Sequence, residues 1–186
     1  MAEVHAIKDI NQVTLISHLL RVRYSHQMSL IWNIGINLAL RISDLLSIKF
    51  TDIQHDRVVL RESKTGKRAE IQLNPKALTL INEIRLQFPT HLYLFQSYRN
   101  QQSINSSPSP LTRRAVTKAF ALVGEELNIR LGTHSMRKTR GYHLYQKTRD
   151  ITRVMKMLRH GSESTSLRYI GITQENIDRD FIELEL

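Results

Sequence analysis

The chain has 186 residues, which is enough for one compact domain with a sizeable buried core. Its 27 Lys and Arg residues outnumber 17 Asp and Glu residues, and the formal net charge of +10 favours a polyanionic partner, first of all nucleic acid, although a membrane surface stays open on charge alone. The absence of cysteine excludes a disulfide framework and a thiolate metal site.

The charge is unevenly distributed along the chain. From Thr173 to the last residue there are five acidic residues and one basic residue, which leaves 26 basic and 12 acidic residues in 1–172. The first twenty residues lack the basic-then-apolar order of a secretory signal, so we expect a cytoplasmic protein. The longest run without a charged side chain, 24–40, is too polar to span a bilayer and predicts a buried helix.

The first part of the chain alternates between helical and strand patterns. Apolar residues recur at helical spacing over 7–22 and 27–40, and Ser43-Asp44 then indicates the cap and acidic first turn of a short helix that ends at Ile48. Arg41 therefore lies at a junction between two helices. Residues 57–62 and 68–73 alternate like strands, and the SKTGK segment between them predicts a β-hairpin with lysines at its tip.

The middle of the chain contains two further helices and a loop. Asn74-Pro75 is a strong helix start, and Pro89 marks where that helix has ended. The Ser-, Asn-, Gln- and Pro-rich segment 96–111 predicts a long exposed loop. Thr112 then caps a helix with one apolar face, formed by Val116, Ala119, Phe120, Val123 and Leu127.

Three helices are predicted near the C-terminal end. The first opens at Thr133, the second opens at Asp150 and ends near Gly161, and the third opens at Ser162 and presents Tyr169.

The last six residues, FIELEL at 181–186, alternate and predict a terminal strand. The sum is an α+β fold that is mainly α-helical, with a small antiparallel β-sheet.

Two basic positions are candidates for binding an anion. His134 and Arg137 are three residues apart, so they share a helix face near an N-terminus, where backbone N–H groups and the helix dipole favour a phosphate. The alternative is an ordinary surface pair. Arg41 follows an apolar run and requires a partner or a function, since an unpaired arginine is costly to desolvate. An ion pair with Asp44, a phosphate contact, or both would explain it.

Two further signals are weak when taken alone. Lys64, at the hairpin tip, is by default a solvated turn lysine. The stretch LRHGSESTSLRY places His160 and Tyr169 nine positions apart, and a solvated basic helix is the simplest interpretation of it.

Taken together and in order, these motifs resemble the tyrosine recombinases, the phage integrase family, over essentially the whole chain. The resemblance rests on the arginine in ALRISDLL, the lysine in SKTGK, the histidine and arginine in THSMRK, and the histidine and tyrosine in LRHGSESTSLRY. The family usually has glycine where this chain has Arg159, and often threonine where it has Ser166.

The resemblance implies the tyrosine recombinase catalytic-domain fold and a site-specific recombinase that cleaves and rejoins DNA through a 3′-phosphotyrosyl intermediate. The reaction would need no metal, ATP or other cofactor. Tyr169 would be the nucleophile and His134 the group that takes its proton. The phosphate would be held by Arg41, Arg137 and His160, and Lys64 would protonate the leaving 5′-oxygen. Arg159 and Arg168 would contact the DNA backbone or form ion pairs.

The resemblance also implies a domain arrangement and partners. We expect residues 1–172 to be the catalytic domain, without a separate N-terminal core-binding domain, and the acidic tail 173–186 to dock in cis or on a neighbouring protomer. The implied partners are double-stranded DNA, further copies of the chain in a synaptic tetramer that can be monomeric when free, and an accessory DNA-bending protein. A bacterial or phage origin follows from the same family, with no membrane partner.

Three other functions stay open at this point. A type IB topoisomerase-like enzyme uses similar residues to relax supercoiled DNA, and a catalytically silent DNA-binding regulator would keep the fold alone. A metal-dependent nuclease is weaker, because no carboxylate cluster of the ligand type accompanies His134 or His160.

Overall fold

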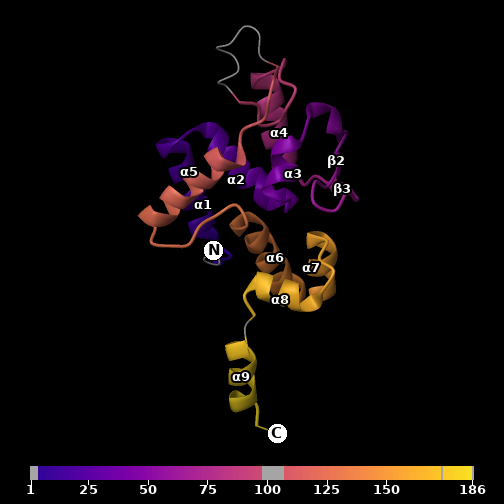
Figure 1. Ribbon diagram of the computed structural model, residues 1–186. Coiled ribbons are helices and arrows are strands. Elements are labelled where there is room, and N and C mark those ends of the chain that lie inside the picture. Colours follow the sequence, from indigo (N-terminus) through magenta and orange to yellow (C-terminus); the bar gives the residue numbers. More distant parts are fainter. Residues whose placement is uncertain (1–3, 98–106, 173, 186) are drawn as a thin grey trace.

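The computed structural model describes residues 4–97, 107–172 and 174–185. It is mainly helical with one small antiparallel sheet, as the sequence predicts. Figure 1 shows helices α1 to α5 and the sheet on one side of the molecule and helices α6 to α8 on the other, with α9 standing apart from both. In this described part of the chain, every helix is too short or too polar to cross a membrane.

Helix α2 (His26–Leu38) lies at the centre of the fold. It packs against α1 (Ile10–Arg23), α4 (Pro75–Gln87) and α6 (Ser135–Thr148), and most of its residues are buried. Its Trp32 is fully buried, and the indole N–H donates a 3.0 Å hydrogen bond to the Val13 carbonyl. The buried helix predicted from the uncharged run is therefore confirmed.

The predicted hairpin is also confirmed. Strands β2 (Arg57–Arg61) and β3 (Arg68–Gln72) pair antiparallel, with Val58 opposite Ile71. Gly66 closes the turn with a φ of 66°, a conformation that glycine adopts without strain, and its N–H donates to the Glu62 carbonyl at 2.8 Å. A third strand, β1 (Ile53–Gln54), follows the short 3-10 helix η1 (Phe50–Asp52) and pairs with β2. The sequence did not indicate β1, because two residues show no periodicity.

Helix α3 (Ile42–Ser47) begins earlier than predicted. Its N-cap is Arg41, so Ser43 lies inside the first turn instead of capping it. The predicted loop at 96–111 is described only at its ends, since 98–106 lie outside the described residues. Those ends are paired: Gln96 forms a β-bridge with Pro110, and the Leu111 N–H donates to the Phe95 carbonyl at 2.8 Å.

Helices α6, α7 (Ile151–Leu158) and α8 (Glu163–Ile170) pack against one another and form a second hydrophobic cluster. Its buried residues are Ala39, Val154, Leu158 and Ile170. The Asp150 and Ser162 side chains cap α7 and α8 as predicted. Helix α6 begins one residue later than expected, with His134 as N-cap, and the C-cap of α7 is Arg159, two residues before Gly161.

The predicted strand at 181–186 is wrong. Residues 174–183 form helix α9, which extends into that segment. A lone strand leaves its backbone N–H and C=O groups without partners, whereas a helix satisfies them internally. Ile182 and Leu184, which alternate with acidic residues, are 78% and 67% exposed, so the alternation does not mark a buried strand face, and the neighbouring Phe181 is 82% exposed.

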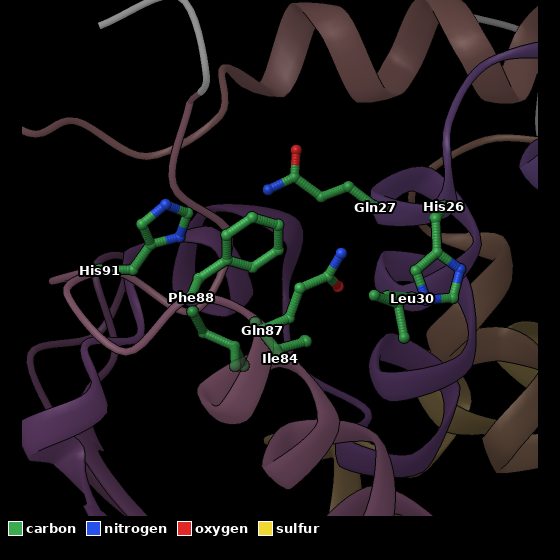
Figure 2. Close-up of a pocket in the computed structure, with 8 residues that line it drawn as sticks. His26, Gln27, Leu30, Ile84, Gln87, Phe88 and His91 are labelled. Carbon is green, nitrogen blue, oxygen red and sulfur yellow. The ribbon is translucent and has the colours of Figure 1, made fainter. Parts of the chain in front are cut away.

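A small cavity of about 40 Å³ lies between α2 and the end of α4. In Figure 2, His26 and Leu30 of α2 face Phe88 and His91 across it. The Phe88 and His91 rings stack with centroids 4.5 Å apart. A cavity of this size has room for about one water molecule and not for an organic ligand.

Gly124 sets how closely α5 (Arg113–Glu126) approaches the segment that leads to α6. A β-carbon at this position would lie 2.7 Å from the Ile129 carbonyl oxygen and 2.9 Å from Leu131 Cβ, and backbone cannot move aside as a side chain can. We expect Gly124→Ala to lower the free energy of unfolding by about 1–3 kcal/mol in chemical denaturation, as other overpacked cores do. Gly161→Ala, whose β-carbon meets no atom within 4 Å, should change it little. Equal stability of the two variants would contradict this packing.

Candidate active site

Arg137 joins the ends of two helices. Its side chain lies in the interior, and the residue is 1% exposed. Nη1 donates to the Ala39 carbonyl at 2.6 Å, and Nη2 donates to the Leu158 carbonyl at 2.7 Å. Ala39 is the C-cap of α2 and Leu158 is the last residue of α7, so both carbonyls lie at the negative ends of helix dipoles. Arg41 lies two residues after Ala39, and His160 lies two residues after Leu158. The same guanidinium group therefore fixes the positions of both.

Tyr169 lies within hydrogen-bonding distance of His134. The Tyr169 hydroxyl is 2.7 Å from His134 Nδ1, and the two rings meet edge to face. Tyr169 comes from the end of α8, and His134 is the N-cap of α6. Lys138 lies one turn after His134 on the same face, with Nζ 5.3 Å from the centre of the Tyr169 ring. The sequence reasoning missed Lys138, although its spacing from His134 was a usable signal.

The protonation states of this pair follow from its surroundings. Burial raises the pKa of the Tyr169 phenol above its ordinary value, although the charge and hydrogen bond of Arg137 act in the opposite direction. Partial desolvation lowers the pKa of His134, and the positive charges of Arg137, Arg113, Lys138 and Arg41 lower it further. At neutral pH the pair therefore consists of a protonated phenol and a neutral imidazole.

His160 also packs against Tyr169. Its ring meets the Tyr169 ring edge to face at 4.8 Å, and Nδ1 is 3.0 Å from the Ser166 hydroxyl. Burial, and then the charges of Arg137, Arg41 and Arg159, lower the pKa of His160 to about 4. This imidazole is also neutral at pH 7.

Arg41 is paired with Glu62 and only weakly with Asp44. Its Nη1 lies 3.0 Å from Glu62 Oε1 and 4.0 Å from Asp44 Oδ2. Asp44 instead accepts hydrogen bonds from the Ser63 N–H and the Ser63 hydroxyl, at 2.8 and 2.7 Å. The sequence reasoning missed Glu62. The strand alternation could have revealed it. Val58, Leu60 and Glu62 occupy alternate positions and therefore face the same, inward side, so the Glu62 carboxylate had to be buried.

Arg159 makes the ion pair that was one of two alternatives for it. Its Nε donates to Glu62 Oε1 at 2.6 Å. Arg168, in contrast, is exposed and lines a groove of about 450 Å³ beside Tyr169, to which Arg113, His134 and Lys138 also contribute.

Lys64 stands apart from the other candidates. It is exposed in the hairpin turn, and within the described residues it makes no hydrogen bond or ion pair with the other five predicted side chains. Arg41, His134, Arg137, His160 and Tyr169 do converge. The charge of Arg41 acts on the pKa of both histidines and of Tyr169, which places these groups within electrostatic reach of one another.

The arrangement is suited to an anion. Arg137 Nε is buried without a hydrogen-bond partner, which is an uncommon state for a guanidinium nitrogen and leaves a donor for a ligand. In the described part of the chain, His, Asp and Glu side chains form no group of three or more that could hold a metal ion. Guanidinium and imidazole groups lie around the Tyr169 hydroxyl.

Arg137→Ala should destabilise the fold as well as the site. The change leaves the Ala39 and Leu158 carbonyls without their donor and opens a cavity, so we expect the free energy of unfolding to fall by about 3 kcal/mol or more. The control is Arg21→Ala, an exposed arginine on α1, which should change stability by less than about 0.5 kcal/mol. If thermal and chemical denaturation rank the two variants alike, Arg137 does not hold the helices together.

Known proteins resemble this chain in sequence and in structure. The probable integrase/recombinase YoeC of Bacillus subtilis is 39% identical over 142 residues, which cover 76% of this chain and 75% of that protein. The tyrosine recombinase XerA of Pyrococcus furiosus is 28% identical over 141 residues, 74% of this chain and 48% of that protein. The chain thus spans about half the length of this second relative.

Solved structures share the fold. A crystal structure of XerA recombinase matches with a TM-score of 0.73 and 13% identity, over 100% of this chain and 66% of that one. A lambda integrase dimer bound to a core site matches with a TM-score of 0.70 and 16% identity, over 92% of this chain and 62% of that one. XerH recombinase bound to its difH substrate matches with a TM-score of 0.69 and 17% identity, over 99% of this chain and 56% of that one.

The sequence pattern of the Phage integrase family matches residues 8–176, which is nearly the whole chain and includes all six predicted site residues. The chain belongs to the phage integrase family, the tyrosine recombinases.

Proposed function

We propose that this tyrosine-type recombinase breaks and rejoins double-stranded DNA at specific sites through a covalent 3′-phosphotyrosyl bond to Tyr169. The observation that carries the proposal is the 2.7 Å contact between the Tyr169 hydroxyl and a neutral His134, beside the buried Arg137. The names of YoeC, an integrase/recombinase, and of XerA, a tyrosine recombinase, support the same reaction class.

The attack begins with proton transfer from Tyr169. Its phenol is protonated at neutral pH, because burial raises its pKa, and a protonated phenol is a poor nucleophile. Neutral His134 accepts the proton through Nδ1 as the phenol oxygen bonds to phosphorus. The Arg137 charge stabilises the negative charge that develops on that oxygen.

The phosphate is held by the cationic cluster while the P–O5′ bond breaks. Arg41 and Arg137 neutralise the growing charge on the non-bridging oxygens, and His160 donates one hydrogen bond as a neutral ring. One such donor is commonly worth ~2.7–4 kcal/mol of barrier. Lys64 gives its proton to the leaving 5′-oxygen. Attack of another 5′-hydroxyl on the phosphotyrosyl bond then rejoins the strand and restores Tyr169.

The substrate and the assembly follow from charge and exposure. Residues 1–172, with 26 basic and 12 acidic residues, form the DNA-binding catalytic domain of the proposal. The lambda integrase in the matching structure is a dimer on its DNA site, and we extend this to several copies of the present chain in a synaptic tetramer. The C-terminal segment supports this extension because Phe181 and Ile182 of α9 and Leu184 after it are largely exposed, as expected if 173–186 dock on a neighbouring protomer.

The covalent step can be tested on DNA of randomised sequence. A pool of nicked duplexes with a randomised segment would be incubated with the protein, and DNA that stays attached under denaturing conditions would be recovered and sequenced. We expect the wild type to enrich one sequence and Tyr169→Phe to yield no adduct. Tyr142→Phe, a change on α6 beside Lys8, is the matched control and should retain adduct formation. Adduct from Tyr169→Phe would show that another group is the nucleophile.

The pH dependence of cleavage tests the role of His134. The base must be neutral, and its pKa lies below the ordinary value of 6.5, so the single-turnover rate should stay on its plateau down to that pH and fall only below it. Arg113→Gln removes one of the charges that lower the His134 pKa and should move the acid limb to higher pH. Lys118→Gln, an exposed change on the same helix, is the control. If Arg113→Gln does not shift the pH at which the cleavage rate falls, His134 is not the base.

A further inference from the structure

Arg159 occupies a backbone position that suits glycine. It ends α7 in the left-handed region with a φ of 53°, where a β-carbon is disfavoured. Arg149 ends α6 in the same conformation, so the backbone position alone does not assign Arg159 a role, whereas the contacts of its side chain do.

The side chain reaches Glu62, 97 residues away in sequence, where β2 enters the turn that carries Lys64. Arg159 Nε donates to Glu62 Oε1 at 2.6 Å, and the same oxygen lies 3.0 Å from Arg41 Nη1. Glu62 Oε2 accepts the Thr65 hydroxyl at 2.8 Å. The Glu62 side chain is only 1% exposed, so one buried carboxylate joins two guanidinium groups from opposite sides of the site.

This carboxylate stays charged throughout the working pH range. Burial alone would raise the pKa of Glu62, but hydrogen bonds from Arg159 and Thr65 and the charges of Arg159 and Arg41 outweigh it and lower the pKa to about 2. With Arg159 present, the carboxylate is shared, and the Arg41–Glu62–Arg159 group keeps one net positive charge. Without Arg159, Glu62 would neutralise Arg41 alone, and the pair would stabilise the charge that develops on the phosphate during cleavage less strongly.

Glu62 also closes the turn that carries Lys64. Its N–H donates to the Lys67 carbonyl at 2.9 Å, and its carbonyl accepts the Gly66 N–H at 2.8 Å. Asp44 holds Ser63 from the side of α3, while Arg159 holds Glu62 from the junction of α7 and α8. The hairpin is thus held both by α3, through Asp44, and by the junction of α7 and α8, through Arg159. His160 directly follows Arg159 in the sequence.

We propose that Arg159 is a positioning residue that acts through Glu62 to hold Arg41 and the Lys64 hairpin in register with His160 around the scissile phosphate. The proposal rests on the proposed function, since it takes Arg41 and Lys64 as groups that act on DNA. Arg159 itself need not touch the DNA.

The test compares Arg159→Gly, Arg159→Lys and Glu62→Gln in the full chain. Arg159→Gly removes the ion pair and at the same time relieves the left-handed backbone. We expect amide hydrogen exchange at Glu62, Gly66 and Lys67 to rise by about tenfold, as for loss of one charge-assisted hydrogen bond, while the unfolding midpoint does not fall. Arg159→Lys keeps the charge without the Nε donor and should restore part of the protection.

The same variants are then assayed on the DNA sequence recovered with the wild type. At saturating DNA, Arg159→Gly should lower the single-turnover cleavage rate by about tenfold with a Kd within about twofold of wild type. In a Glu62→Gln background, Arg159→Gly should have little further effect, because the two residues act as one unit. Arg153→Ala removes an exposed arginine of α7 that pairs with Asp150, and should leave the cleavage rate and the exchange unchanged.

Two results would overturn the proposal. If Arg159→Gly weakens DNA binding and its salt dependence but leaves the cleavage rate and hairpin exchange unchanged, Arg159 is a DNA backbone contact. If exchange rises throughout the chain and the unfolding midpoint falls, its role is only structural. A wild type that forms no adduct with any DNA in the pool contradicts the proposed function instead, and hairpin exchange then decides by itself whether Arg159 holds the hairpin.

Discussion

The two hydrogen bonds from Arg137 to the Ala39 and Leu158 carbonyls are the constraint on which the site depends. They fasten the end of the central helix α2, most of whose buried residues lie in the main hydrophobic cluster, to the end of α7, whose buried residues lie in the second. Because Arg41 and His160 closely follow these carbonyls, one buried guanidinium group fixes residues that are more than a hundred positions apart in sequence. Tyr169 then packs on the second cluster, and its hydroxyl meets His134.

Electrostatics assign each group a single protonation state. Three arginines in a small space repel one another, and Glu62 offsets part of that repulsion with a carboxylate that remains ionised down to a pH of about 2. The remaining positive charge, added to desolvation, keeps His134 and His160 neutral at pH 7. A neutral His134 can accept a proton, and Tyr169 has one to give. The cluster that attracts a phosphate therefore also prepares the nucleophile.

Local sequence signals predicted the elements well where a side chain acts on its own backbone. Asn74, Thr112, Asp150 and Ser162 cap the helices at which they were expected. The errors arose where contacts between distant segments determine the secondary structure or the partner of a side chain. The alternation in 181–186 fits a strand, but residues 174–183 form a helix instead. The partner of Arg41 could not be chosen from sequence distance: Asp44 is three residues away, yet the inward register of β2 brings Glu62 closer. The six residue types of the site were recognisable in order, whereas tertiary packing sets which of them converge: five do, and Lys64 stands apart.

A crystal structure of the chain with orthovanadate and a short duplex DNA that carries a strand break at the cleavage site would test this convergence most directly. Vanadate adopts the five-coordinate geometry of phosphoryl transfer, so it reports where the transition state is held. We expect it to be bound to the Tyr169 oxygen and contacted by Arg41, Arg137 and His160, with Arg137 still bonded to the Ala39 and Leu158 carbonyls. Vanadate bound away from these side chains, or an Arg137 that has left both carbonyls, would contradict the site described for this chain.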